Sequence, residues 1–472
     1  MPNAIDLFCG AGGMSEGLIQ AGFHILFSSD ISEDVERTYT QRHEQLGLIQ
    51  GENTFFHRGD ISDLNRDFIY QAIQNLTIFQ GHEIPNIDAI FGGPPCQGFS
   101  LAGRRRRNDP RNMLFGQYLR IINEIQPKYV VMENVEGFLY TKLDQFIGVT
   151  EKVYPDDSLV TDILENELSE IGYSVLPTTV LDASNYGVPQ KRRRVIFIAY
   201  RNGLTPPEYP EINDVRDLTV QDAIGDLIID NQRRQEINPI GTDYQISSIQ
   251  GRTPTIIYAD RNTIEFGNPI AHEGEQYNHQ TSKHSTLVVE RFKLYNDGEN
   301  TPALISRIKR EGEPLIRLSS PNLLEYCFNN QNEYDNFESF VQEIQSGTIT
   351  EDILKLLLSK KGNRLKYDPN TAAPTVVTLP DDFINPFENR IPTVRELARL
   401  QSFDDSFFFE GKRTTGGPRR RVEVPQYTQV GNAVPPLLAK AVALKVKEAI
   451  NNNNLQMEIK DNNTKEARLV NQ

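Results

Sequence analysis

The chain has 472 residues and a mass of 53.7 kDa, more than one hydrophobic core usually covers, so we expect two lobes. Hydrophobic residues make up 38% and charged residues 24% of the sequence, a composition that excludes a disordered chain. No apolar run is long enough for a membrane span, and no signal sequence follows Met1, so we expect a cytoplasmic protein. The three cysteines, Cys9, Cys96 and Cys327, form no CxxC pair, so neither a disulfide framework nor a metal site is indicated.

The net charge of -15 is unfavourable for binding nucleic acid, but the positive charges are clustered. Three short runs, at 101–112, 190–194 and 411–421, carry net charges of +4, +4 and +5, which leaves the other residues strongly acidic. A single run of this kind is usually a solvated loop. Three runs beside candidate catalytic motifs instead predict basic patches on an acidic body.

Residues 1–203 alternate apolar runs with amphipathic stretches, a pattern typical of a doubly wound α/β sheet. The predicted strands span residues 4–8, 24–28, 87–91, 129–132, 174–181 and 195–199. The predicted helices between them span residues 14–21, 32–43 and 115–125. We therefore expect the first part of the chain to fold as an α/β domain.

From residue 204 to about 390 the sequence is rich in Asn, Gly, Pro and Ser, which indicates an irregular domain with helices at 287–295 and 351–359. The α/β pattern returns at 391–450, where helices at 393–403 and 435–450 would complete the first domain. The tail, 451–472, is polar and is expected to fray. These patterns predict an α/β domain interrupted by a second, smaller lobe.

The first predicted strand runs directly into CGAGGMSEG, which places Gly10, Gly12 and Gly13 in the turn that opens the next helix. Glycines let the backbone approach a ligand closely, and free amides at a helix N-terminus can hold a carboxylate or phosphate. Asp30 follows the second strand at a spacing that suits ribose hydroxyls, and Asp60 falls where the third strand should end. Either acid alone could be a helix N-cap, but together these residues predict a nucleoside cofactor.

Cys96 lies in GGPPCQGFS, just past the predicted strand at 87–91, where open α/β sheets bind their ligands. A lone cysteine is usually a small buried apolar residue. Here two glycines and two prolines precede it and polar residues follow, which indicates a loop rather than a core position. Glu133 follows the next strand, and although it could be an N-cap or a surface acid, we predict a nucleophile and an acid at one sheet edge.

Six blocks resemble, in order and spacing, those of DNA (cytosine-5) methyltransferases of the bacterial restriction-modification type: DLFCGAGG, GGPPCQGFS, ENV, QKRRR, RELARLQSF and QVGNAVPP. The resemblance covers residues 4–200 and 391–446, and it departs from the family at Asp404 and Asn385, where Pro and His are common. It implies a Rossmann-like S-adenosylmethionine-dependent methyltransferase sheet with a target recognition domain at 204–390. The implied reaction transfers a methyl group to carbon 5 of a flipped-out cytosine in a specific double-stranded DNA sequence.

The resemblance also implies roles for single residues. Carbon 5 of cytosine is a poor nucleophile, and addition of the Cys96 thiolate at carbon 6 makes it enamine-like. Glu133 would bond ring nitrogen 3 and the exocyclic amine, while Arg192 and Arg194 would hold the base carbonyl and a flanking phosphate. The implied cofactor contacts are Phe8, Gly10, Gly12, Gly13, Asp30, Ile31, Asp60, Ile61, Pro95, Leu114 and Asn432. The implied DNA contacts are Ser100, Arg104, Arg105, Arg106, Arg107 and Gln190, most of them in a loop that closes over the DNA.

Three other classes of protein compete with this interpretation. A nicotinamide-dependent oxidoreductase would explain the glycine turn and Asp30, but not the blocks around Cys96 and Glu133. A transfer RNA cytosine-5 methyltransferase shares the blocks, but its variable region is usually shorter than residues 204–390. A binding protein that has lost its activity is disfavoured because the implied catalytic residues are present.

We expect a monomer whose partners are double-stranded DNA and a cognate restriction endonuclease that acts on the same site.

Overall fold

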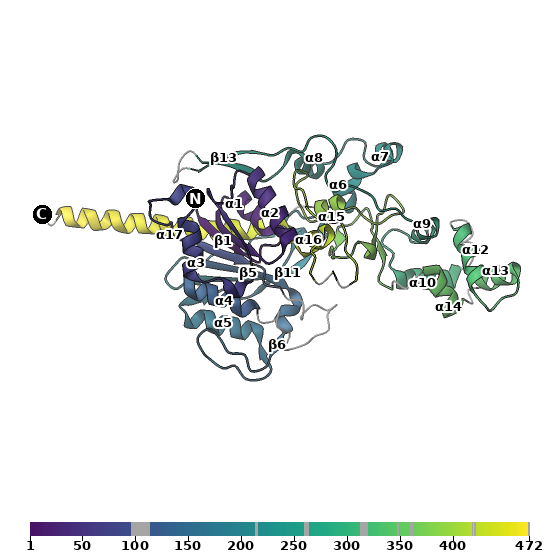
Figure 1. Cartoon of the computed structure of the whole chain (residues 1–472), viewed down its shortest axis with the longest axis horizontal. Coiled ribbons are helices and arrows are strands. Elements are labelled where there is room, and N and C mark those ends of the chain that lie inside the picture. Colours follow the sequence, from purple (N-terminus) through teal and green to yellow (C-terminus); the bar gives the residue numbers. More distant parts are fainter. Residues whose placement is uncertain are drawn as a thin grey trace.

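The computed structural model describes residues 1–95, 114–212, 216–258, 264–311, 320–346, 349–358, 362–417, 419 and 422–470. The molecule is elongated, with a sheet domain at one end, a small helical lobe at the other and a middle body between them (Figure 1). Separate hydrophobic cores lie on the two faces of the sheet, in the middle body and in the helical lobe.

Among the described residues, eight strands form the main sheet, in the order β3-β2-β1-β4-β5-β11-β8 with β9 also paired to β11. They are β1 (Asn3–Leu7), β2 (His24–Asp30), β3 (Phe55–Arg58), β4 (Ala89–Gly92), β5 (Tyr129–Val135), β8 (Tyr173–Val175), β9 (Thr179–Asp182) and β11 (Arg193–Arg201). Strands β1 to β5 run parallel, whereas β11 is antiparallel to its neighbours. The strand order reverses between β1 and β4, so the predicted doubly wound fold is confirmed, and such a reversal is where these sheets bind ligands.

Helices cover both faces of the sheet. On one face lie α3 (Arg66–Gln74), α4 (Leu114–Ile125) and α5 (Val160–Glu170), and on the other lie α1 (Gly13–Ala21) and the first half of α17 (Pro436–Val470). Successive side chains of a strand point to opposite faces, so Ile90 of β4 belongs to the first of these cores and Phe91 to the second. Helix α2 (Glu33–Gln45) follows β2 and contacts β3.

The strand predicted at 174–181 is interrupted. Residues 173–175 form β8 and residues 179–182 form β9, and both pair with β11. Pro177 lies between them, and because proline has no backbone N–H it cannot continue the ladder.

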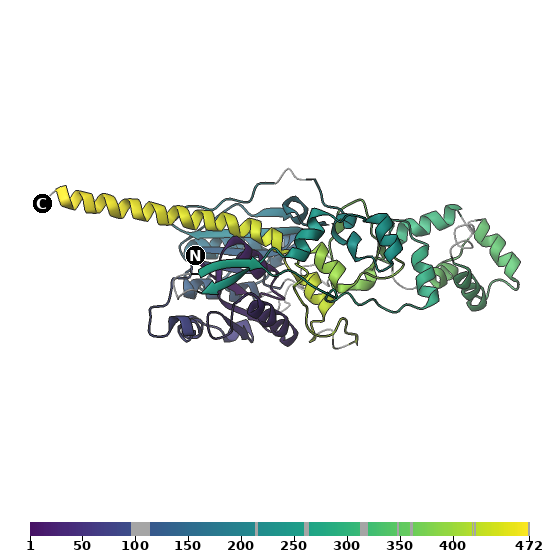
Figure 2. The ribbon, with the colours of Figure 1, turned by 90° about the horizontal axis from the view of Figure 1, so that it is seen from above.

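Residues 451–470, which we expected to fray, continue α17 as far as Val470. After Pro436 the helix contains neither Gly nor Pro, the residues that usually end a helix. Asn453 ties it to the sheet domain: its Oδ1 accepts from the Thr205 amide at 2.8 Å, and its Nδ2 donates to the Tyr129 hydroxyl. At 1.5 Å per residue the helix is about 52 Å long, and its far end extends beyond the sheet domain (Figure 2).

Residues 204–390, expected to form one irregular domain, divide among three bodies. Helices α6 (Val220–Ile224) and α8 (Asp243–Gln250) share the middle core with α15 (Val394–Leu400) and α16 (Gln426–Asn432). The hairpin of β12 (Pro254–Tyr258) and β13 (Ile264–Pro269) instead packs on the sheet domain, where Ile256 joins the core under α1 and α17. The helical lobe contains α9 (Thr286–Lys293), α10 (Thr301–Glu311), α12 (Pro321–Asn330), α13 (Phe337–Gln345) and α14 (Glu351–Leu358).

The remaining described strands and α-helices are short. They are β6 (Lys142–Leu143), β7 (Ser158–Leu159), β10 (Gln190–Lys191), α7 (Asn231–Ile237), β14 (Leu365–Lys366), β15 (Ala373–Pro374) and β16 (Phe383–Ile384). The parallel pair of β10 and β15 brings the basic run at 190–194 beside the end of the expected variable region. Within the part of the chain that the structure describes, no helix is both long and apolar enough to cross a membrane.

Candidate active site

The carboxyl ends of β1, β2, β4 and β5 meet at one edge of the sheet, because these strands are parallel neighbours. Leu7 of β1 pairs with Ser29 of β2 and with Gly92 of β4. The glycine turn, the Asp30 segment, the loop after Gly92 and the Glu133 region therefore start at neighbouring places. This edge is where the sequence predicts both the cofactor and the chemistry.

The turn after β1 leaves its backbone open to a ligand. Phe8, Gly10 and Gly12 have φ values of 56°, 54° and 95°, in the left-handed region that favours glycine. A Cβ added to Gly10 would meet nothing within 4 Å. The turn leads into α1, whose first amides have no partner within the helix. We call the turn from Phe8 to Gly13, with the free amides of α1, the cofactor cradle. It fits a carboxylate-bearing nucleoside such as S-adenosylmethionine.

The last sequence block folds against this turn. A Cβ on Gly13 would lie 2.2 Å from the Val434 carbonyl oxygen and 3.3 Å from the Ala433 Cβ, so only glycine permits the contact. Asn432, the expected cofactor residue of this block, is exposed beside it at the end of α16. The resemblance implied a cofactor role for Asn432, and the structure brings the segment that carries Asn432 against the glycine turn.

The Asp30 carboxylate binds backbone amides at and beside the cofactor cradle. Its carboxylate accepts from the Gly10 amide at 3.2 Å and from the Ser32 amide at 2.9 Å. Burial raises the pKa of Asp30, and the bonds from backbone amides oppose this rise. The next side chain, Ile31, is 69% exposed and leaves apolar surface beside the turn for a flat ring.

Asp60 begins the short 3-10 helix at Ile61–Asp63. Its Oδ1 accepts from the Ser62 amide at 2.9 Å and from the Ser62 hydroxyl at 2.8 Å, and these bonds lower the pKa of Asp60. The side chain of Ile61 packs in the core that contains α3, α4 and α5 rather than at the sheet edge, so it anchors the chain next to Asp60. Pro95 and Leu114, the other expected cofactor contacts of this region, are partly buried.

A buried hydrogen-bond chain lies beneath the cradle, and sequence reasoning missed it. The Ser15 hydroxyl donates to Asp6 Oδ2 at 2.5 Å and lies 2.8 Å from the Tyr39 hydroxyl, which in turn is 2.5 Å from the Ser28 hydroxyl. Burial, with a smaller contribution from the charge of Asp30, raises the pKa of Asp6 from 3.8 to about 7. A carboxylate inside an otherwise apolar strand was the available signal.

Asp6 should make the stability of the protein depend on pH. Its pKa is higher in the folded than in the unfolded chain, so the folded state loses stability as pH rises from about 4 to about 7, by up to about 4 kcal/mol. Asp6→Asn should flatten this slope, so that the variant gains stability relative to wild type between pH 5 and pH 8. Melting temperatures at pH 5, 6.5 and 8 measure the effect, with Asp67→Asn, at an exposed carboxylate, as the control. Equal slopes in wild type and Asp6→Asn would rule this role out.

Glu133 and Arg194 form an ion pair at the end of β5. The Arg194 Nε lies 2.8 Å from Glu133 Oε1, and each side chain is 11% exposed. β11 pairs with β5 so that Arg194 stands opposite Val135, which brings the two charges together. A carboxylate and a guanidinium side by side can bind the donor and acceptor groups of one planar base.

The loop that leads to Cys96 is held against Glu133. A Cβ on Gly93 would lie 3.4 Å from Glu133 Oε2, and Asn134 Nδ2 donates to the Pro94 carbonyl at 3.2 Å. Asn134 was not among the predicted site residues, although its place between Glu133 and Val135 in the ENV block was a signal. Some predicted residues lie outside the described part of the chain: Cys96, Ser100, Arg104, Arg105, Arg106 and Arg107.

Two predicted site residues are placed differently from what the sequence suggested. Gln190, a predicted DNA contact, is 0% exposed, and its amide binds the Leu400 carbonyl, the Gln401 side chain and the Val376 amide. Arg192, predicted to hold the base or a phosphate, is 2% exposed and donates to backbone carbonyls. Burial lowers the pKa of Arg192 from its usual value, and the nearby Arg194 charge adds to this. Both side chains point inward because of the two-residue period of the strand.

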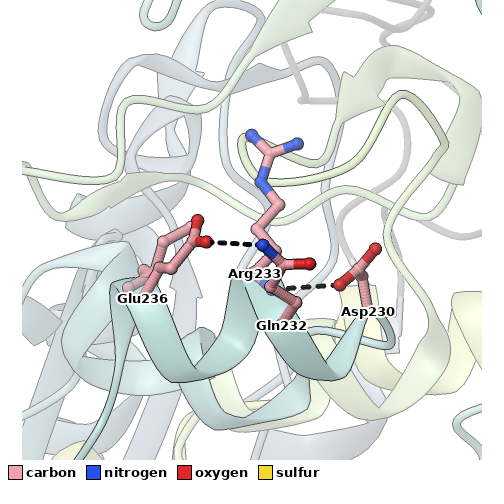
Figure 3. A pocket seen from close by; sticks show the side chains of 5 residues that line it. Asp230, Gln232, Arg233 and Glu236 are labelled. Atoms are coloured by element: carbon pink, nitrogen blue, oxygen red, sulfur yellow. Dashed lines mark hydrogen bonds between the residues drawn. The ribbon is translucent and has the colours of Figure 1, made fainter.

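A hollow on the middle body lies away from this edge. It is lined by one short helix, α7, and the cap residue before it (Figure 3). Gln232 Nε2 donates to Glu236 Oε1 at 3.1 Å, and the Arg233 amide donates to Asp230 at 3.0 Å. The side chains of Asp230, Gln232 and Glu236 are therefore bonded within this segment, and the hollow does not form part of the candidate site.

Comparison with known proteins agrees with this geometry. The family model of the C-5 cytosine-specific DNA methylase matches residues 3–448. The Type II methyltransferase M.DdeI of Desulfomicrobium norvegicum is 31% identical, over 99% of this chain and 93% of the relative. The Type II methyltransferase M.AgeI of Thalassovita gelatinovora is 29% identical, over 94% of this chain and 99% of the relative.

A solved structure shares the fold. It is a protein encoded within an Escherichia coli prophage and assigned as a DNA modification methyltransferase, with a TM-score of 0.59 and 22% identity over 96% of this chain and 100% of that chain. The matched family acts on DNA, which supports DNA rather than transfer RNA as the substrate. The chain therefore belongs to the C-5 cytosine-specific DNA methylases, enzymes that transfer a methyl group from S-adenosylmethionine to carbon 5 of cytosine.

Proposed function

We propose that this enzyme methylates one cytosine of a specific double-stranded DNA sequence through a covalent bond between Cys96 and carbon 6 of the flipped-out base. The Glu133–Arg194 ion pair carries the proposal, because it lies beside the loop that leads directly into Cys96. A cytosine inside a duplex offers neither carbon 5 nor carbon 6 to a protein, so the base must leave the stack at a cost of a few kcal/mol.

In the proposed mechanism, the Cys96 thiolate adds to carbon 6 and pushes electron density to carbon 5. Glu133 delivers a proton to ring nitrogen 3 as the thiolate adds and accepts a hydrogen bond from the exocyclic amine, and Arg194 holds the base carbonyl, so the negative charge that develops on the ring is neutralised. Ring nitrogen 3 returns this proton to Glu133 when Cys96 leaves. The cofactor supplies the methyl group. Loss of the carbon-5 proton to a water molecule then expels Cys96 and restores the aromatic ring.

The cradle residues are the proposed cofactor contacts. The glycine turn with Phe8 and the α1 amides would hold the amino acid end, and Asp30 would bind the ribose hydroxyls. Ile31 offers apolar surface, and Asp60 would bind the adenine amine. A backbone contact from Ile61 and contacts from Pro95, Leu114 and Asn432 would complete the site.

Target recognition is proposed for residues 204–390. The helical lobe α9–α14 supports this, because it has a core of its own and lies far from the sheet (Figure 1). Ser100 and the arginines 104–107 are proposed to meet DNA phosphates. We further propose that the enzyme is a monomer, works in the cytoplasm and protects DNA from a restriction endonuclease with the same target, since its relatives are named Type II methyltransferases.

DNA containing 5-fluorocytosine tests the mechanism, because fluorine cannot leave as the carbon-5 proton does. Wild type with labelled S-adenosylmethionine should form a complex that survives denaturing electrophoresis, and Cys96→Ala should not. Cys327→Ala is the matched control, since Cys327 is buried in the helical lobe, and it should trap DNA as wild type does. Trapping by Cys96→Ala, or none by wild type, would refute the covalent mechanism.

A further inference from the structure

The basic run at 190–194 has two faces with different environments. Gln190 and Arg192 are buried, whereas Lys191 and Arg193 are exposed. Alternation of this kind follows from the period of an extended strand. The inward side chains of this run therefore act inside the protein, and what they hold is informative.

Arg192 grips the turn that follows α16. Its Nη2 donates to the Gly431 carbonyl at 3.1 Å and to the Ala433 carbonyl at 3.0 Å, the residues on either side of Asn432. Its Nη1 donates to the Val376 carbonyl at 3.2 Å. Carbonyls at the end of a helix lack helical partners and carry partial negative charge, so a guanidinium is well suited to this place.

Gln190 provides a second connection to the turn that follows α16. Its Oε1 accepts from the Val376 amide at 2.8 Å, and its Nε2 donates to Gln401 Oε1 at 2.9 Å. Gln401 in turn donates to the Val430 carbonyl at 2.8 Å. Residues 430–433 are thus connected to residues 190–192 by two independent routes, one through Arg192 and one through Gln190 and Gln401.

The other side of the same turn meets the cofactor cradle. Gly13 opens α1 and packs so closely on Val434 that a Cβ would come within 2.2 Å of its carbonyl oxygen. The segment 431–434 is therefore wedged between Arg192 and the glycine turn. A shift of this segment would move Asn432 relative to the cradle.

We infer that Arg192 is a positioning residue that holds Asn432 at the edge of the cofactor cradle through the Gly431 and Ala433 carbonyls. The inference rests on the proposed function, which assigns Asn432 to the cofactor. The inference assigns different roles to two neighbouring arginines. Arg194 pairs with Glu133 and binds the base, whereas Arg192 supports cofactor binding.

The test is the affinity for S-adenosylmethionine without DNA, measured by calorimetry. Arg192→Met should weaken binding by at least about tenfold, because it removes hydrogen bonds from a charged donor. At saturating cofactor its kcat should stay within about threefold of wild type. Arg192→Lys, which keeps the charge, should recover part of the affinity. Lys191→Met, at the exposed neighbour, should bind the cofactor within about twofold of wild type.

The outcomes are distinguishable. Arg192→Met with wild-type cofactor affinity and a kcat reduced by about 100-fold would overturn the inference. It would indicate that Arg192 acts on the base instead. If Arg192→Met does not fold, Arg192→Lys carries the test, and wild-type affinity in that variant together with a reduced kcat also overturns the inference. Failure of the wild-type protein to bind S-adenosylmethionine would instead count against the proposed function.

Discussion

Replacement of Glu133 with glutamine is expected to lower kcat by about 10³-fold, which corresponds to about 4 kcal/mol of transition-state stabilisation. Glutamine keeps the size of the side chain but removes the negative charge that pairs with Arg194 at 2.8 Å. Glutamine has no proton to transfer to ring nitrogen 3, and Arg194 would be left without its counter-ion. Single-turnover transfer of labelled methyl groups to unmethylated plasmid DNA, at saturating cofactor and DNA, measures the effect.

Glu136→Gln is the matched control for this experiment. Glu136 lies three residues further along the chain, and its carboxylate pairs with Arg193 at 2.9 Å, with side chains 38% and 59% exposed. An exposed pair of this kind contributes little, so kcat should stay within about twofold of wild type. Cofactor affinity should be unchanged in both variants. More than a tenth of the wild-type kcat in Glu133→Gln would show that the carboxylate does not act on the base.

The sheet and the site edge could be predicted because their signals are local. Apart from β3, whose bounds were not predicted, each parallel strand contains a short apolar run, and the residues at or just after its end, such as Gly10, Asp30 and Glu133, meet at one edge through topology alone. The place of the last block against Gly13 came from the family resemblance, since no local pattern links residues so far apart.

The inward positions of Gln190 and Arg192 could not be predicted from side-chain chemistry. Their partners are mostly backbone groups of distant residues, such as Val376 and Gly431, and any sequence offers such groups. The run is uniformly basic after Gln190, so no alternation in the sequence distinguishes the inward side chains from the outward ones.

The helical lobe was only half predicted, because polar residues obscure its periodicity. Leu304 and Ile308 of α10 lie four residues apart in the core, as do Leu323 and Cys327 of α12. These spacings mark the buried face of a helix. The abundant Asn and Ser between them suggested loops instead, and burial of the lobe core outweighed those local preferences.

Arg399→Met should be the most destabilising of the changes considered, at about 3 to 5 kcal/mol. Arg399 is fully buried in α15, and its Nε and Nη2 donate to the two carboxylate oxygens of Asp405 at 2.6 Å. It also binds Asp226 at 3.0 Å, which connects α15 to the turn after α6. Removal of the guanidinium would leave two carboxylates without their main partner, so the melting temperature should fall by about 3 to 5 °C.

The same substitution at the surface, Arg37→Met, separates this effect from a general one. Arg37 pairs with Asp34 at 2.5 Å but is 51% exposed, so its loss should change the melting temperature by no more than about 1 °C. The pH dependence of stability distinguishes a loss of charge from a loss of packing. Burial alone would raise the pKa of Asp405, but the bonds and charge of Arg399 outweigh it and hold that pKa below its usual range. The stabilisation is therefore complete above the ordinary pKa of about 3.9 and is lost as pH falls through the lower value in the folded state. The difference between wild type and Arg399→Met should shrink below about pH 4, and a constant difference across pH would mean that packing rather than charge explains the loss.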